Sequence, residues 1–159
     1  MPVDIDQLHG LLRATLENLR EMHGLLEQEA EALGTRDAEA MDRIAVKKQE
    51  LVPVLDRLAA EQRLCLGDSE DEAGIEACLA RAGVHASVAD LLRADWREIL
   101  RLLTACKRRN ELNGAYIGLL SRHVETSLDI LLGPSQAEAT YGRDGVKRRG
   151  GVSRRSYSV

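Results

Sequence analysis

The sequence predicts an all-α protein: an elongated antiparallel bundle of three long, coiled-coil-like helices, with a short extra helix and a flexible C-terminal tail. Three observations support this fold class. Hydrophobic residues make up 44% of the 159 residues but aromatic residues only 3%, with no Phe, so the core must consist mostly of Leu, Ala and Val. Such a composition suits helix seams better than a β-sandwich. Apolar residues also recur at alternating steps of three and four, and capping residues or glycines separate these stretches.

The first helix is expected to begin after Asp4, which forms a variant capping box with Gln7, and to end at Gly34. Its leucine stripe is wider than a two-stranded seam requires, so we expect this helix to contact more than one neighbour. The residues that recur every seven positions are Ile5, Leu12, Leu19, Leu26 and Leu33.

The second helix is expected to begin after Asp37 and to run to Leu66. Pro53 lies inside it. Because proline lacks an amide hydrogen, it cannot bond to the Gln49 carbonyl and should bend the helix about one turn before itself. The acidic connector 67–74 follows, and then a short helix over 75–82 that ends at Gly83.

The fourth element is a long helix from about Val88 to Leu132, capped by Ser87 and Asp90 and stopped by Gly133. No proline interrupts it, and a helix of this length needs partners along its whole course. Steps of three and four along it give a seam of Trp96, Ile99, Leu103, Cys106, Asn110, Asn113, Ile117, Leu120, Val124, Ser127 and Leu131.

The seam becomes polar at Asn110 and Asn113, and Gly114 and Gly118 follow. One interpretation is a register lock buried inside the bundle, because a buried Asn lowers stability but specifies pairing. The other is that this part of the seam is open and accepts a helix of another protein, with the glycines allowing close approach. Each mid-helix glycine costs about 1 kcal/mol against alanine, which slightly favours the second interpretation.

Charge divides the chain into a helical domain, residues 1–132, and a basic tail, residues 133–159. The tail carries a net charge of +4 and the rest of the chain −8, which together give the overall −4. Since the tail is rich in Gly, Ser and Arg, we expect it to be flexible when unbound. The basic residues could attract nucleic acid, but aromatic residues for stacking are few and the acidic body would repel it.

Motifs for catalysis or metal binding are lacking, so we expect no enzyme, no cofactor and no metal site. We see no signal peptide and no apolar run long enough to span a membrane. Cys65, Cys78 and Cys106 form no C-x-x-C pair. Together these features predict a cytoplasmic protein without stable membrane insertion.

Several short motifs occur in a fixed order along nearly the whole chain. They are Arg36-Asp37-Ala-Glu-Ala-Met41, Lys47-Lys48-Gln-Glu-Leu51, Asn110-x-x-Asn113-Gly114, Leu131-Leu-Gly133 and Thr140-Tyr141-Gly142-x-x-Gly145. The third and fifth, about thirty residues apart, are the most specific pair. This order resembles the FlgN family of flagellar export chaperones.

The resemblance implies a type III export chaperone for the hook–filament junction proteins FlgK and FlgL. It would bind their helical C-terminal segments, keep them unassembled, and deliver them to the export gate protein FlhA. The family's tail tyrosine, implicated in gate docking, corresponds to Tyr141, with Gly142 and Gly145 beside it. For cargo binding we expect Ile99, Leu103, Asn110, Asn113, Gly114, Ile117, Leu120 and Val124.

Two alternatives from other functional classes stay open. The chain could be a structural coiled-coil oligomer whose seam is buried by its own copies, or a nucleic-acid-associated helical protein. A chaperone free of cargo could also form a homo-oligomer.

Overall fold

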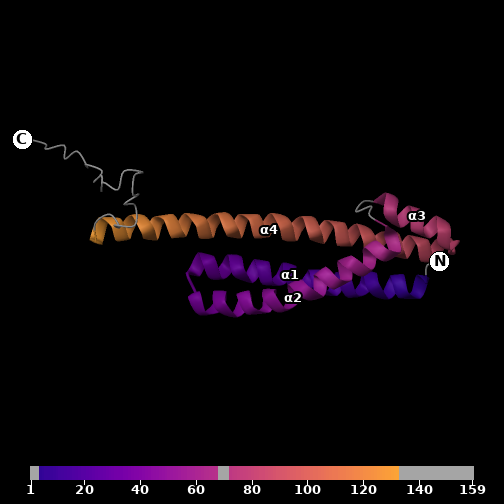
Figure 1. The fold of residues 1–159 in the computed structure, drawn as a ribbon, viewed down its shortest axis with the longest axis horizontal. Coiled ribbons are helices and arrows are strands. Elements are labelled where there is room, and N and C mark those ends of the chain that lie inside the picture. The colour runs from indigo at the N-terminus through magenta and orange to yellow at the C-terminus, as the bar shows by residue number, and fades with distance from the viewer. Residues whose placement is uncertain (1–3, 68–71, 133–159) are drawn as a thin grey trace, which may run out of the picture. The chain divides into compact units, whose positions relative to one another are not determined.

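The computed structural model describes residues 4–67 and 72–132, which form four helices and no strand (Figure 1). These are α1 (Ile5–Thr35), α2 (Ala38–Leu66), α3 (Glu72–Ala82) and α4 (Ala86–Leu132). The predicted all-α class is confirmed. The chain divides into two units, Met1–Ile117 and Gly118–Val159, which we describe separately.

Helices α1 and α2 form a hairpin whose capping residues are those the sequence predicts. The Asp4 carboxylate accepts hydrogen bonds from the amides of Asp6 and Gln7, and the Asp37 carboxylate accepts one from the amide of Ala40. These bonds satisfy amides that the first turn of a helix leaves unpaired.

The predicted end of α1 at Gly34 is wrong. The helix continues to Thr35, and Arg36 takes the left-handed conformation with φ 56°. Asp37, in an extended conformation, already caps α2, so the reversal must take place at Arg36. Its geometry is fixed by a hydrogen bond of 2.9 Å from the Asp37 amide to the Ala32 carbonyl.

Side-chain contacts show that α2 runs antiparallel to α1. The Gln62 amide donates to the Thr15 hydroxyl at 2.7 Å, and the Lys48 ammonium contacts Glu29 at 3.0 Å. Helix α2 contains Pro53 and changes direction part-way along its length, as Figure 1 shows. It ends at Leu66 as predicted.

Helix α4 packs on α1 in the parallel direction. The Cys106 thiol lies 3.8 Å from the Leu19 carbonyl, and the Asn113 amide lies 2.9 Å from the Leu26 carbonyl. Both pairs are separated by 87 residues, and seven residues separate the two contacts on each helix. The two helices therefore pack with a shared heptad spacing, as in a coiled coil.

Two apolar clusters form the core of the first unit. The larger one joins all four helices and includes Leu8, Leu12, Ile75, Leu92 and Ile99, each almost fully buried. The smaller one lies between the later part of α1 and the start of α2, and Cys106 of α4 joins it.

Two predictions for α4 need correction. The helix begins at Ala86, so Ser87 is inside the first turn and the His85 carbonyl accepts the first amide bonds. Leu102 rather than Leu103 is buried between Ile99 and Cys106. Leu102 and Leu103 both fit steps of three and four between Ile99 and Cys106, and packing against the other helices buries Leu102.

Candidate functional site

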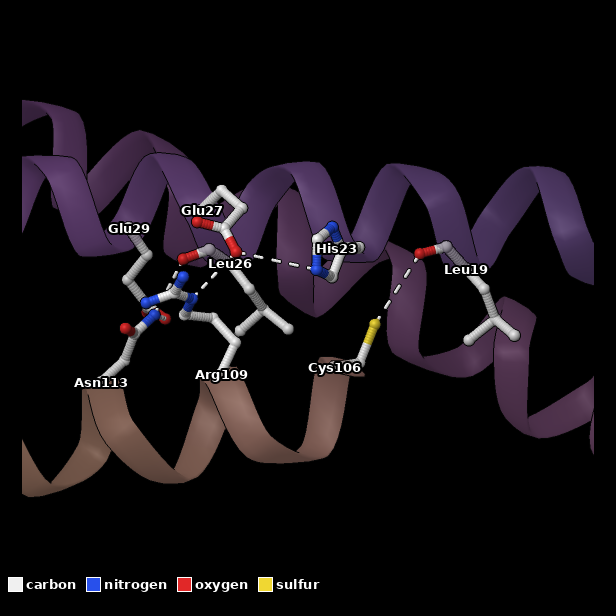
Figure 2. A network of polar contacts seen from close by, with 8 residues as sticks. All are labelled: Leu19, His23, Leu26, Glu27, Glu29, Cys106, Arg109 and Asn113. Carbon is white, nitrogen blue, oxygen red and sulfur yellow. Dashed lines mark hydrogen bonds and ion pairs between the residues drawn. The ribbon is translucent and has the colours of Figure 1, made fainter. Parts of the chain in front are cut away.

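The last buried residue of α4 is Asn113, whose side chain is 4% exposed. Its amide nitrogen donates to the Leu26 carbonyl at 2.9 Å and to the Glu29 carboxylate at 2.8 Å. Figure 2 shows Cys106, Arg109 and Asn113 projecting from α4 toward α1. Glu29 is itself buried and also contacts Lys48 of α2. A polar junction therefore joins three helices at this level.

Asn110 lies at the edge of this polar junction. Its side chain is exposed, and its carbonyl oxygen is 3.5 Å from the Lys48 ammonium. Beside it, the Arg109 guanidinium donates to Glu27 of α1 at 2.9 Å, and the His23 ring lies 3.6 Å from the same carboxylate (Figure 2). No buried polar side-chain atom lacks a partner in the part of the chain that the structure describes.

The expectation that both asparagines face an open seam is therefore wrong for Asn113. Its hydrogen bonds lie within the chain, and its place between Leu26 and Glu29 matches the register-lock interpretation. Ile99 is also fully buried by the other helices. Neither residue is on the surface that a partner would meet.

Beyond Asn113, no described residue of α4 is buried, although apolar residues continue. In the first unit, Tyr116 and Ile117 are exposed, as is Leu112 directly before Asn113. In the second unit, the exposed or partly exposed apolar side chains are Leu119, Leu120, Val124, Leu128, Ile130, Leu131 and Leu132. We call these seven residues the C-terminal apolar face.

The C-terminal apolar face covers somewhat more than half of the circumference of its helix. At 3.6 residues per turn, Leu120, Val124 and Leu131 form its centre, and the other four lie on either side. The opposite side has Gly118 and the charged residues Arg122, Glu125 and Asp129. A stripe this wide is typical of a helix that packs against other helices.

A family model described as "FlgN protein" matches residues 1–149. The chain belongs to the FlgN family. This is a family of flagellar export chaperones, and the resemblance inferred from the sequence motifs is confirmed. No curated protein and no solved structure matches the chain.

The remaining residues predicted for cargo binding in this FlgN-family chain lie in different places. Gly114 is exposed, and a methyl group built on it or on Gly118 would meet no atom within 4 Å. Ile117 is exposed, and Leu120 and Val124 belong to the C-terminal apolar face. Leu103 is about half exposed and lines a groove together with residues of α2.

Sequence reasoning missed several exposed apolar residues that flank the seam, among them Leu112, Tyr116, Leu119 and Leu128. A count of all apolar positions on the helix, rather than steps of three and four alone, would have found them. Tyr141, Gly142 and Gly145, predicted to dock to the gate, lie outside the described residues.

Three further features of the described residues concern metal binding, membrane insertion and cysteine chemistry. Among residues 4–67 and 72–132, no group of three or more His, Cys, Asp or Glu side chains could hold a metal ion. Within the same ranges, no helix is long and apolar enough to cross a membrane. Burial raises the pKa of the Cys78 and Cys106 thiols, so neither is prepared to act as a nucleophile.

Proposed function

We propose that this protein is a cytoplasmic chaperone for the hook–filament junction proteins FlgK and FlgL. The C-terminal apolar face would bind the helical C-terminal segments of these proteins and keep them unassembled before export. The supporting observation is that the apolar stripe of α4 continues past Asn113 without burial among the described residues. Family membership supplies the chaperone role.

The physical basis is helix-in-groove recognition, in which an amphipathic helix inserts its apolar side chains at every third or fourth position. Burying one large aliphatic side chain stabilises an interface by up to about 1.5–3 kcal/mol. On this proposal the cargo segments are amphipathic helices, and covering their apolar stripes before assembly would prevent aggregation. Leu120, Val124 and Leu131 are therefore proposed as the central contacts.

The cargo contact is tested by Val124→Asp, which places a charge at the centre of the face. Val124 is 55% exposed, so the folded chain should tolerate the change while affinity for FlgK or FlgL falls at least about tenfold. Isothermal titration calorimetry with the purified cargo measures the loss, and far-UV circular dichroism checks folding.

The matched control is Leu64→Asp on α2, because Leu64 is 88% exposed and lies outside the face. It should leave cargo affinity unchanged. A folded Val124→Asp variant that binds cargo like the wild type would refute the assignment. Equal losses of cargo affinity in Val124→Asp and Leu64→Asp would also refute it.

For delivery, we propose that Tyr141, with Gly142 and Gly145, docks to the export gate protein FlhA. The basis is the match of Thr140-Tyr141-Gly142-x-x-Gly145 to the family pattern. Tyr141→Ala should weaken FlhA binding and leave cargo affinity intact, whereas Tyr157→Ala in the same tail should change neither. Loss of cargo affinity in Tyr141→Ala would assign the tail to cargo instead.

The exposed face also suits self-association, so a coiled-coil oligomer is the second candidate function. Light scattering distinguishes the two. A chaperone should form a complex of defined size with cargo, even if it self-associates when free. An assembly whose size cargo does not alter would favour the structural role.

A further inference from the structure

A second surface lies within the first unit, between the C-terminal half of α2 and the N-terminal half of α4. It is a groove of about 400 Å³. Among the described residues that line it, most side chains are apolar or uncharged, and Arg63 is the one charged residue. The lining residues are Ala59, Gln62, Arg63, Leu66, Gly67, Trp96, Leu100, Leu103 and Thr104.

The floor of this groove is part of the core. Leu66 and Trp96 are both 5% exposed, and the buried Gln62 amide is held by the Thr15 hydroxyl at 2.7 Å. Leu103, in contrast, is 48% exposed on the groove wall. The groove thus has a fixed floor and an accessible apolar side chain, which is the geometry that accepts an apolar anchor.

Two cations border the groove. Arg63 lines it from α2, and Lys107 lies one turn beyond Leu103 on the same side of α4. Both are exposed, and neither forms an ion pair with any residue of the described ranges. Neighbouring arginines differ in this respect, since Arg57 contacts Glu61 and Arg101 contacts Glu98.

We propose that this groove is a second protein-interaction surface, which takes an acidic amphipathic segment of a partner protein. A large apolar side chain of the partner would lie against Leu103 and Leu100, and flanking carboxylates would pair with Arg63 and Lys107. Charge complementarity selects the acidic partner, because Arg63 and Lys107 would repel a basic segment. The surface is separate from the C-terminal apolar face and does not depend on the cargo assignment.

Trp96 is the only tryptophan of the chain and lines the groove, so its fluorescence reports on this surface. The probe is a synthetic amphipathic helix with a leucine stripe flanked by glutamates, titrated into the full chain. We expect a saturable change in Trp96 emission and reduced acrylamide quenching. The same peptide with lysine in place of each glutamate should bind at least about tenfold more weakly.

Variants locate the contact. Leu103→Asp should weaken binding of the acidic peptide at least about tenfold. Lys107→Glu should weaken it about threefold to tenfold, because an exposed charge contributes less. Leu64→Asp and Leu128→Asp, both exposed apolar positions outside the groove, should leave the titration unchanged. Circular dichroism confirms that each variant is folded.

Three results would overturn the proposal. One is a Trp96 emission that saturating acidic peptide does not alter. Another is equal binding of the acidic and basic peptides. The last is a loss of peptide affinity in Leu128→Asp equal to the loss in Leu103→Asp. That result would place the peptide on the C-terminal apolar face.

Discussion

Replacing Asn113 with alanine tests the polar junction between α1, α2 and α4. The change removes a hydrogen bond to the Leu26 carbonyl at 2.9 Å and one to the buried Glu29 carboxylate at 2.8 Å. A neutral hydrogen bond contributes about 0.5–1.5 kcal/mol and one to a charged group about 1.5–3 kcal/mol. The free energy of unfolding should therefore fall by about 2–4 kcal/mol, a large part of the 5–15 kcal/mol of a typical domain.

Asn110→Ala is the matched control, since it makes the same change of helix propensity three residues away. The Asn110 side chain is exposed and only 3.5 Å from Lys48, so its loss should cost less than about 0.5 kcal/mol. Urea unfolding followed by circular dichroism measures both variants. A double-mutant cycle with Glu29→Ala should give a coupling energy of about 1–3 kcal/mol.

The reasoning is refuted if Asn113→Ala and Asn110→Ala lose the same stability. It is also refuted if Asn113 and Glu29 show no coupling. Either result would mean that the junction does not hold α4 on α1.

Two further predictions concern titrating groups. Because burial raises the pKa of the Cys78 and Cys106 thiols, both should react with a thiol reagent at pH ~8 more slowly than the partly exposed Cys65. Equal rates in the folded chain would contradict this. The Arg93 guanidinium, which donates to Glu76 at 2.6 Å, holds the pKa of that carboxyl below its usual value, so Arg93→Ala should raise it in an NMR titration. Since the folded-state pKa is the lower one, this pair stabilises the fold above the unfolded-state pKa. The stabilisation is lost as the pH falls through the folded-state pKa, so the stability difference between wild type and variant should shrink on acidification. An unchanged Glu76 titration would show that Arg93 is not the cause.

The sequence predicted the helices well because their signals are local. Asp4 and Asp37 cap α1 and α2, Gly83 follows α3, and α4 reaches Leu132. Each of these positions depends on a residue and its immediate neighbours. The prediction at Gly34 failed because Gly34 stays within the helix and the chain reverses at Arg36, directly before the cap residue Asp37.

The candidate site was harder to predict because burial depends on distant segments. Ile99 and Leu120 occupy equivalent positions in the repeat, yet Ile99 is fully buried and Leu120 is partly exposed. The repeat indicates which side of a helix is apolar and gives no information on which part of that side has a partner within the chain. Asn113 shows the same limit, because only the α1 residues beside it decide whether it is buried.

Hydrogen exchange, followed by mass spectrometry with and without the C-terminal segment of FlgK, tests the central claim most directly. We predict slower exchange of the backbone amides of residues 119–132 when cargo is bound, with no change in the already buried α1 segment around Leu12. A complex that forms without protection of residues 119–132 would show that the C-terminal apolar face is not the cargo site.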